Sequence, residues 1–323
     1  MSEQTLLIGD IGGTNARFAL ADPDEPGFSA QEVLECAKYA TADDAIREYL
    51  ESAGAGSPDA ICLAAAGPIV NEQVRFTNNP WTLSAADLRS EFGISRARLL
   101  NDFEAIAYSV PWLKHDELMD IGLPEAEPFG DRDYTIGVLG PGTGLGSVGL
   151  VRRGDLLIPL PSEASHGGFA AETQVQLDIL TQLRERFDRV SSERVVSGQG
   201  VENLYWALTR IHHDKRAQLT AAEIFGATPE DNPRATEAVE LFYEILGQVA
   251  GDLALALGAD AIFIAGGIAQ RYPERLADSR FRTGFEHKGR HRSLMERIPT
   301  QLITHPQPGL LGAAYCARLL AAD

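Results

Sequence analysis

The sequence is poor in cysteine, in basic residues and in long apolar runs, and each shortage excludes a class of protein. Its three cysteines, Cys36, Cys62 and Cys316, lie far apart and form no CxxC pair. This spacing argues against a disulfide framework and against a cysteine-ligated zinc site. No apolar stretch approaches the length of a membrane-spanning helix. Because no basic, apolar leader precedes the first apolar segment, we expect no secretory signal and a cytoplasmic location.

Basic residues are outnumbered by acidic ones. The chain of 323 residues has 28 Lys and Arg against 46 Asp and Glu, which gives a net charge of −18. A surface of this charge repels nucleic acids and anionic lipids, so we expect neither a nucleic-acid partner nor a membrane partner. An anionic substrate such as ATP must then be held locally, by backbone N–H groups, a metal ion or a few basic side chains.

Several common catalytic and nucleotide-binding motifs are absent. The dipeptide Gly-Lys never occurs, which excludes a GxxxxGK[ST] phosphate loop, and neither HExxH nor GxSxG is present. The segment GTGLGS leads into a strand pattern rather than a helix, so it does not fit a dinucleotide fingerprint. Nucleotide binding through a Rossmann turn is therefore disfavoured.

Apolar runs and turn signals alternate in the manner of an α/β protein. Buried strands are predicted at 5–9, 16–21, 59–67, 97–102, 135–140 and 260–267, and helices at 43–54, 84–93, 103–113, 171–189, 233–257 and 308–322. Ser84 is a good N-cap for its helix and Gly93 a good C-terminal residue. Residues 114–134 are acidic and rich in Gly and Pro, so they predict a domain boundary.

One pattern occurs twice: an apolar strand, a glycine-rich turn with a threonine, and a second apolar strand. The first copy is LLIGDIGGTNARFAL and the second is TIGVLGPGTGLGSVGLV. Glycine permits a positive φ and lets a ligand approach the backbone, and turn N–H groups can bind an anion. Two such hairpins predict a polyphosphate site, with Asp10 beside it to hold a metal ion. The alternative is a pair of hairpin turns without a ligand.

From nearly one end to the other, the chain resembles the bacterial glucokinases of the hexokinase/actin-like ATPase superfamily, in the group without a zinc motif. The blocks that carry the resemblance are GDIGGTNARFAL, TNNPW, LLNDFEAIA, GPGTGLG, SSERVVSGQG, IFIAGGI, FEHKGR and PGLLGAA. The resemblance implies a two-domain α/β fold of the actin-like ATPase/hexokinase type with a ligand cleft between the domains. The small domain is expected at 1–112 plus 303–323 and the large domain at 113–302. It also implies glucose and ATP as substrates, Mg²⁺ as a cofactor, and a homodimer.

The resemblance assigns roles residue by residue. Asp102 is the expected general base, Asn101 a sugar contact, and Glu163, His166 and Glu193 further sugar contacts. The expected ATP contacts are Gly9, Asp10, Gly12, Gly13, Thr14, Asn15, Gly142, Thr143, Gly144, Gly266 and Gly267, with Asp10 also expected to bind Mg²⁺ through the ATP phosphates. The residues alone allow plainer roles: Asp102 as a helix N-cap, Glu193 as a capping-box partner, and Gly266 and Gly267 as a closely packed strand–helix connection.

The sugar loop departs from the family pattern. Close relatives usually read Gly-Glu-Gly-Gly-His, whereas this chain has Ser162, Ala164 and Ser165 in place of the three glycines. Either the loop never needed a positive φ, or it has moved and the selectivity among hexoses has changed. Asn78 and Asn79 of TNNPW lie near the sugar pocket in the family, or form a plain turn before Pro80. Lys288 and Arg290 receive no role.

The predicted function is ATP-dependent phosphorylation of glucose to glucose 6-phosphate. Closure of the two domains over the sugar would exclude water, which would otherwise accept the phosphoryl group. Two alternatives remain open: a kinase for another hexose, such as fructose or mannose, and a sugar-sensing regulator without catalysis. Regulators of this superfamily carry an added helix-turn-helix, and the strongly acidic chain offers no surface for an operator.

Overall fold

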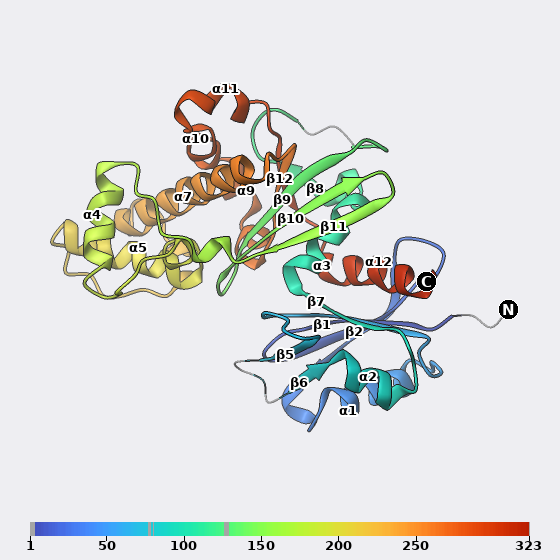
Figure 1. The fold of residues 1–323 in the computed structure, drawn as a ribbon. Helices are drawn as coiled ribbons and strands as arrows, with labels where there is room; N and C mark the ends of the chain where they lie inside the picture. The colour runs from blue at the N-terminus through green and yellow to red at the C-terminus, as the bar shows by residue number, and fades with distance from the viewer. Residues whose placement is uncertain (1–3, 77–78, 80, 126–128, 323) are drawn as a thin grey trace. The chain divides into compact units, whose positions relative to one another are not determined.

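The computed structural model describes residues 4–76, 79, 81–125 and 129–322, and Asn78 lies outside these residues. The chain divides into two compact units (Figure 1): unit 1 comprises Met1–Lys114 and His305–Asp323, and unit 2 comprises His115–Thr304. Each unit contains one main β-sheet with its own apolar core. The predicted α/β class is thereby confirmed. Among the described residues, no helix has the length and apolar character needed to cross a bilayer.

Unit 1 is built on a five-stranded sheet with the order β3-β2-β1-β4-β7. Strands β1, β4 and β7 are parallel, whereas β1–β2 and β2–β3 are antiparallel pairs. The strands of the unit are β1 Leu6–Ile11, β2 Asn15–Ala21, β3 Phe28–Glu35, β4 Ala60–Ala65, β5 Gln73–Arg75, β6 Thr82–Ser84 and β7 Ala97–Asn101. Every residue of β4 is buried, as expected for a central parallel strand with helices on both faces.

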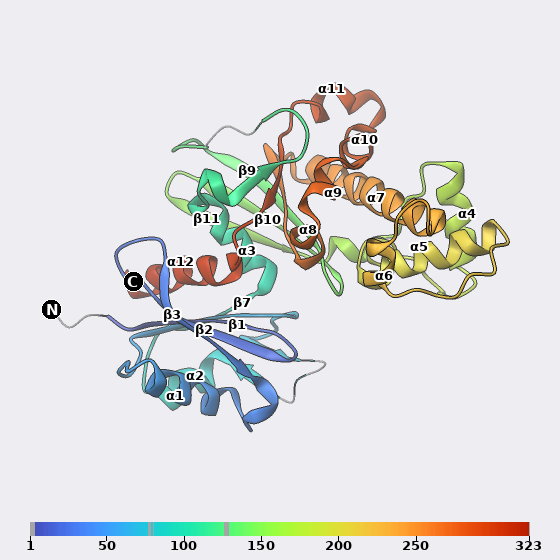
Figure 2. The same ribbon diagram turned by 180° about the vertical axis from the view of Figure 1, so that it is seen from behind.

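Four α-helices cover this sheet: α1 Ala42–Ser52, α2 Ala85–Phe92, α3 Asp102–Ser109 and α12 Pro308–Ala322. Helices α1 and α2 lie on one face, and α3 and α12 lie on the other (Figures 1 and 2). The predicted caps of α2 are confirmed, because Ser84 accepts from Asp87 N–H and Gly93 has φ 65°. A Cβ at Gly312 of α12 would overlap Ala105 O of α3, so this glycine lets the two helix backbones touch. The C-terminal helix thus supports the start of α3.

Unit 2 contains a six-stranded sheet with the order β11-β10-β9-β12-β13-β8. Its strands are β8 Leu118–Asp120, β9 Tyr134–Pro141, β10 Leu145–Arg153, β11 Leu156–Ser162, β12 Ala261–Ile264 and β13 Thr300–Ile303. The antiparallel β9–β10 pair is the second predicted hairpin, and β12 lies parallel to β9. The strands predicted from the sequence do not include β8, β11 and β13 of unit 2 or β3, β5 and β6 of unit 1.

The helices of unit 2 pack mainly around one long helix, α7. They are α4 Gln174–Leu183, α5 Gly198–Ile211, α6 Ala221–Gly226, α7 Pro233–Leu257, α8 Gly267–Arg271, α9 Pro273–Ala277, α10 Phe281–Glu286 and α11 Arg292–Met295. Helix α7 has the predicted bounds, with Asn232 as N-cap, Pro233 in the first turn and Gly258 at φ 61° after its end. It packs against β9, α5 and α10 (Figure 2).

Candidate active site

Two acids lie at the carboxyl edge of the sheet of unit 1. Within the parallel strands, Asp10 of β1 is in register with Ala64 of β4, and Ala65 is in register with Asn101 at the end of β7. Asp102 follows directly as the first residue of α3. Parallel strands place their carboxyl ends at one edge, where open α/β sheets bind ligands. The fold therefore brings Asp10 and Asp102 together.

Asn101, and not Asp102, is the N-cap of α3. The Asn101 Oδ1 accepts from Phe103 N–H at 2.9 Å, and its Nδ2 donates to Gly67 O at 3.1 Å. Asp102 Oδ1 accepts from the same N–H at 2.9 Å, which leaves its second carboxylate oxygen outside the cap. The plain capping role therefore belongs to Asn101, whose amide is already engaged within the protein.

The environment of Asp102 suits a proton acceptor. Burial raises the pKa of its carboxyl to about 6; the Phe103 N–H acts in the opposite direction, and the nearby charge of Asp10 adds to the increase. A base with this pKa is ionised at neutral pH and still holds a proton more readily than an exposed carboxylate. Asp102 can therefore take a proton from an alcohol during its reaction.

Asp10 has the character of a cation ligand. Burial raises the pKa of its carboxyl, and the Arg17 guanidinium, 3.6 Å from Oδ2, acts in the opposite direction. A further cation would relieve the cost of burying this charge. No group of three or more His, Cys, Asp or Glu side chains arranged for a metal occurs among residues 4–76, 79, 81–125 and 129–322. A single carboxylate suits Mg²⁺, which usually keeps waters and substrate phosphates as its other ligands.

The first glycine-rich turn spans Gly12 to Asn15 and is closed by its own backbone. Gly12 N–H donates to Asn15 O at 2.9 Å, while Gly12 O accepts from Asn79 Nδ2 at 3.3 Å. Gly12, and Gly142 and Gly144 of the second turn, do not use the positive φ that glycine permits; of the expected ATP glycines, Gly266 alone has a positive φ. In these turns glycine contributes the absence of a side chain. At Gly142 no atom lies within 4 Å of the Cβ position, so the space beside the backbone is open.

The second turn, between β9 and β10, is joined to the start of α5. Gly142 N–H donates to Gly144 O at 2.8 Å, and Gly142 O accepts from Gly198 N–H at 2.9 Å. Ser197 caps α5 by accepting from Gly200 N–H at 2.9 Å. The N-terminus of this helix of 14 residues therefore faces the turn, where its dipole favours an anion. This helix was not predicted from the sequence. The signal for its start is Ser197, which is followed by Gly-Gln-Gly.

A pocket of about 280 Å³ opens beside the second turn, wholly within unit 2. It brings together three of the predicted ATP residues, Gly142, Thr143 and Gly267. Its other lining residues, which sequence reasoning missed, are Gly198, Ala221, Ala222, Phe225, Ile268, Arg271 and Tyr272. The Phe225 and Tyr272 rings are stacked at 4.9 Å with an interplanar angle of 17°. The pocket thus joins a glycine-rich turn to an apolar, aromatic chamber.

Gly266, next to this pocket, has a structural role. It adopts φ +87°, and a Cβ there would lie 2.6 Å from Pro141 O at the end of β9. The alternative of close packing therefore describes Gly266, whereas Gly267 is open and lines the pocket. Gly9 is likewise structural, because it lies inside β1 and a Cβ would meet Leu63 Cδ2 at 2.8 Å.

Two predicted sugar contacts of unit 2, Glu163 and Glu193, lie beside the imidazole of the third, His166. His166 Nε2 lies 3.6 Å from Glu163 Oε2, and His166 Nδ1 lies 3.9 Å from Glu193 Oε1. The other Glu193 oxygen, Oε2, accepts from Leu145 N–H at 3.1 Å. A hydrogen bond thus fixes Glu193 to β10, directly after the second turn. The arrangement offers two carboxylates and an imidazole to adjacent hydroxyl groups.

The loop that carries these residues needs no glycine for its backbone. Ala164–His166 form a short 3₁₀ turn, and neither Ala164 nor Ser165 has a positive φ. The replacement of glycines in this loop therefore causes no backbone strain. This removes the conformational reason for expecting a displaced loop.

Two other segments singled out from the sequence have structural contacts. Asn79 is buried, and its Oδ1 accepts from Trp81 N–H at 3.0 Å while its amide holds Gly12 O. Lys288, with a side chain only 5% exposed, lies 2.7 Å from Asp252 Oδ1 and 3.4 Å from Glu172 Oε1. Lys288 therefore ties the segment after α10 to α7 and does not present a free cation.

Comparison with known proteins decides the family. A sequence profile of the glucokinase family matches residues 7–320. The chain belongs to the glucokinase family. It is 43% identical over 308 residues to a glucokinase of Chromohalobacter salexigens, with 95% of each chain covered, and 42% identical over 318 residues to one of Paramagnetospirillum magneticum, with 96% of this chain and 97% of the relative covered. The family predicted from the sequence is thereby confirmed.

Solved structures support the same conclusion. The crystal structure of a glucokinase from an Antarctic psychrotroph is 35% identical, covers 97% of this chain and 98% of its own, and superposes with a TM-score of 0.89. A glucokinase of the ROK family from Streptomyces griseus, 18% identical, shares the fold with a TM-score of 0.63 over 98% of this chain and 99% of its own. The two-domain sugar-kinase fold expected for this family member is confirmed.

Proposed function

We propose that Asp102 is the general base with which this glucokinase-family enzyme transfers the γ-phosphoryl group of ATP to glucose. The product is glucose 6-phosphate. One observation carries the assignment: Asp102 lies at the carboxyl edge of the sheet beside a second acid, with its pKa raised to about 6. Neighbouring carboxylates in different environments commonly divide the acid–base and metal-binding roles.

The reaction assigns a task to each group. Asp102 accepts the proton of the 6-hydroxyl as the oxygen attacks phosphorus, while Glu163, His166 and Glu193 orient other hydroxyls of the sugar. Asn101 supports this site through its cap and its bond to Gly67 O, and its place as a sugar contact remains part of the proposal.

The glycine-rich turns are proposed to hold the phosphates. Since Gly12 and Gly142 use their N–H groups inside the turns, the contacts are assigned to Gly13 and Thr14 in the first and to Thr143 in the second. Asn15, at the end of the first turn, completes this set. The pocket lined by Gly267 is assigned to the nucleoside. Asp10 would hold Mg²⁺, which would neutralise charge on the phosphates.

Two further features belong to the proposal: a cytoplasmic location and a homodimer. All three cysteines are unpaired thiols, which suits a reducing compartment. For the dimer, the support beyond the family resemblance is an apolar stripe on the edge strand β11, where Leu156, Ile158 and Leu160 are 66, 45 and 38% exposed. Cell fractionation and analytical ultracentrifugation test these two features.

The direct test is glucose 6-phosphate formation from ATP and glucose, measured with a coupled dehydrogenase and repeated with fructose and mannose. The proposal expects turnover with glucose that depends on Mg²⁺ and fails in Asp102→Asn. A chain that binds glucose but never forms a phosphorylated sugar is a regulator instead. Preference for another hexose replaces the substrate and leaves the roles of Asp102 and Asp10 in place.

A further inference from the structure

The pocket of unit 2 has few side chains that recognise one base by hydrogen bonding. Of its ten lining residues, Thr143, Arg271 and Tyr272 carry side chains that form hydrogen bonds, and none is Asp, Glu, Asn or Gln. Adenine and guanine differ at the edge that carries the exocyclic group, a donor in adenine and an acceptor in guanine. A carboxylate or an amide is the usual side chain that distinguishes such edges.

The walls are aromatic and are fixed by packing. Phe225 stacks on Tyr272, and its other contacts are edge-on, with Phe242 at 5.4 Å and 89° and with Tyr243 at 6.2 Å and 61°. A planar purine fits such a chamber through apolar burial and stacking, which every purine offers equally. An apolar chamber discriminates weakly between ligands of similar shape, about 10²-fold at most, whereas a site with matched hydrogen bonds discriminates by 10⁴ or more.

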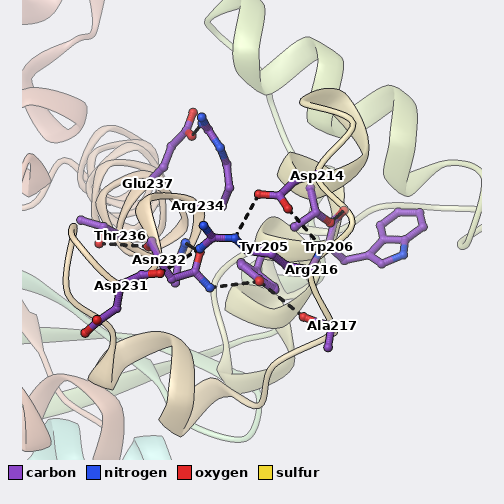
Figure 3. A network of polar contacts seen from close by, with 12 residues as sticks. Tyr205, Trp206, Asp214, Arg216, Ala217, Asp231, Asn232, Arg234, Thr236 and Glu237 are labelled. Atoms are coloured by element: carbon purple, nitrogen blue, oxygen red, sulfur yellow. Dashed lines mark hydrogen bonds and ion pairs between the residues drawn. The ribbon is translucent and has the colours of Figure 1, made fainter.

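Hydrogen bonds hold the loops on both sides of α6, the helix that carries Phe225, and Figure 3 shows those made by Arg216 and Asn232. At the first residue of α6, Ala221 N–H donates to Glu202 Oε1 at 2.9 Å, and in the loop before it Arg216 Nη1 donates to Asp231 O at 3.0 Å. After α6, Asn232 Nδ2 donates to Tyr205 OH at 3.1 Å. These bonds connect the loops at both ends of α6 to each other and to α5.

Arg271 is the cation of the pocket. It is the last residue of α8, one turn beyond Gly267, and both residues line the pocket. Among the described residues its guanidinium has no ion pair or hydrogen bond, and it is exposed. Arginine donates hydrogen bonds and accepts none, and the ring nitrogen acceptor N7 is common to adenine and guanine. Its contact therefore favours purines without choosing between them.

We propose that the enzyme accepts purine nucleoside triphosphates as a class, GTP and ITP as well as ATP, and that Arg271 binds the acceptor atoms that purines share. The inference rests on the assignment of this pocket to the nucleoside. With GTP the bond between the γ-phosphorus and the oxygen bridging to the β-phosphate breaks, and a bond from phosphorus to the 6-oxygen of glucose forms. The hydroxyl proton passes to Asp102, and GDP leaves.

The experiment measures glucose 6-phosphate through its dehydrogenase, so the readout is the same for every nucleotide. Wild-type enzyme is assayed with ATP, GTP, ITP, UTP and CTP, and calorimetry measures nucleotide binding without glucose. We expect kcat/KM for GTP and ITP within about 10-fold of ATP, and for UTP and CTP about 100-fold lower because the smaller ring fills less of the chamber. Arg271→Met should weaken the binding of ATP and GTP by a similar factor, about 10-fold.

The outcomes separate the inference from the proposed function. Arg292→Met is the matched control, because Arg292 pairs with Glu296 and does not line the pocket; it should leave both nucleotides unaffected. GTP at less than 10⁻³ of the ATP value, or an Arg271→Met effect confined to one purine, overturns the inference while ATP turnover upholds the proposed function. Unchanged binding of every nucleotide in Arg271→Met also overturns it. Absence of glucose 6-phosphate with ATP refutes the proposed function itself.

Discussion

Replacing Asp102 by asparagine removes the proton acceptor while keeping the size of the side chain. General-base catalysis contributes about 10²- to 10⁴-fold, so kcat should fall by at least ~10². This corresponds to about 3 kcal/mol or more of lost transition-state stabilisation. Glucose affinity should change by less than about threefold, because the sugar contacts of unit 2 remain. Single-turnover assays and calorimetry on the same preparation measure the two effects separately.

The pKa of Asp102 gives a second, independent signature. Since it is raised to about 6, wild-type kcat/KM should decline on the acid side with a midpoint near pH 6. With that pKa the carboxylate is about 97% ionised at pH 7.5 and about 9% ionised at pH 5, so the loss approaches tenfold per pH unit below the midpoint. In Asp102→Asn the residual activity should lack this acid limb.

As the pH rises through about 6, the free energy of unfolding should fall while kcat/KM rises. The folded-state pKa of Asp102 exceeds the ordinary value of 3.8, so its stabilising contribution is complete below about pH 4 and is lost as the pH rises through about 6. At pH 7.5 the ionised carboxylate is therefore a net cost, and Asp102→Asn should gain about 1–3 kcal/mol in urea unfolding. A variant that keeps near-normal kcat and loses stability would mean that Asp102 serves the helix, and it would refute the assignment.

Glu104→Gln is the matched control for these measurements. Glu104 is another buried acid of α3, but its Oε1 pairs with Arg98 Nη2 at 3.0 Å. Burial raises the pKa of the Glu104 carboxyl while the Arg98 guanidinium acts in the opposite direction, so Glu104→Gln should change the free energy of unfolding less than Asp102→Asn does. The acid limb of kcat/KM should remain near pH 6. If Glu104→Gln abolishes that limb, the wrong carboxylate has been chosen.

Four further substitutions test the second turn, the sugar group and the domain support. Gly144→Val should raise KM for ATP and also weaken glucose binding, because a Cβ there would lie 2.5 Å from Glu193 Oε2; kinetics in both substrates measure this. Glu163→Gln and His166→Ala should each weaken glucose binding by about 1–3 kcal/mol in calorimetry, with nucleotide binding little affected. Gly312→Ala should lower the free energy of unfolding by about 1–3 kcal/mol, since its methyl group overlaps the α3 backbone; urea denaturation measures it.

Each of these predictions has a control on an open surface. Gly56 has no atom within 4 Å of a Cβ position, so Gly56→Val and Gly56→Ala should leave kinetics and stability near wild type. Glu230→Gln removes an exposed charge of unit 2 and should not alter glucose binding. Loss of ATP affinity alone in Gly144→Val would contradict the contact with Glu193. Wild-type glucose affinity in Glu163→Gln or His166→Ala would remove that residue from the site.

Regular elements with a local signal could be predicted from the sequence. Apolar segments on both sides of a glycine-rich turn predict the hairpins β1–β2 and β9–β10. A serine cap and a C-terminal glycine predict α2, and an uninterrupted amphipathic pattern from 233 to 257 predicts α7. Strands β3 and β11 were not predicted because they lie at sheet edges and have several exposed positions. Their sequence patterns therefore differ from those of buried strands.

The walls of the pocket could not be predicted, for a related reason. Helices α6 and α8 have six and five residues, too few for a helical period to emerge. Phe225 and Tyr272 resemble ordinary core residues in the sequence, and only the packing of α6 against α7 shows that one stacked pair faces the chamber. Similarly, the sequence offers Asp102 as the helix cap, and only the extended backbone of Asn101 and its hydrogen bond from Phe103 N–H show that Asn101 caps α3.

The two glycine-rich hairpins share a plan but differ in the size of the turn. The first leaves four residues between the paired Ile11 and Ala16, and the second leaves three between Pro141 and Leu145. In both, the first glycine of the turn closes it through N–H and is held from outside through its carbonyl, by Asn79 in one and by Gly198 in the other.

The two hairpins differ chemically at the position two residues before the first glycine of each turn. Asp10 precedes Gly12 by two positions, whereas the corresponding position before Gly142 is Gly140, which has no side chain to bind a cation. The helix N-terminus and the apolar chamber adjoin the second turn. The same type of glycine-rich turn therefore occurs twice, and the neighbouring groups give each copy a different chemistry. In the proposed assignment, the first turn lies beside the cation ligand Asp10, and the second turn lies beside the pocket assigned to the nucleoside.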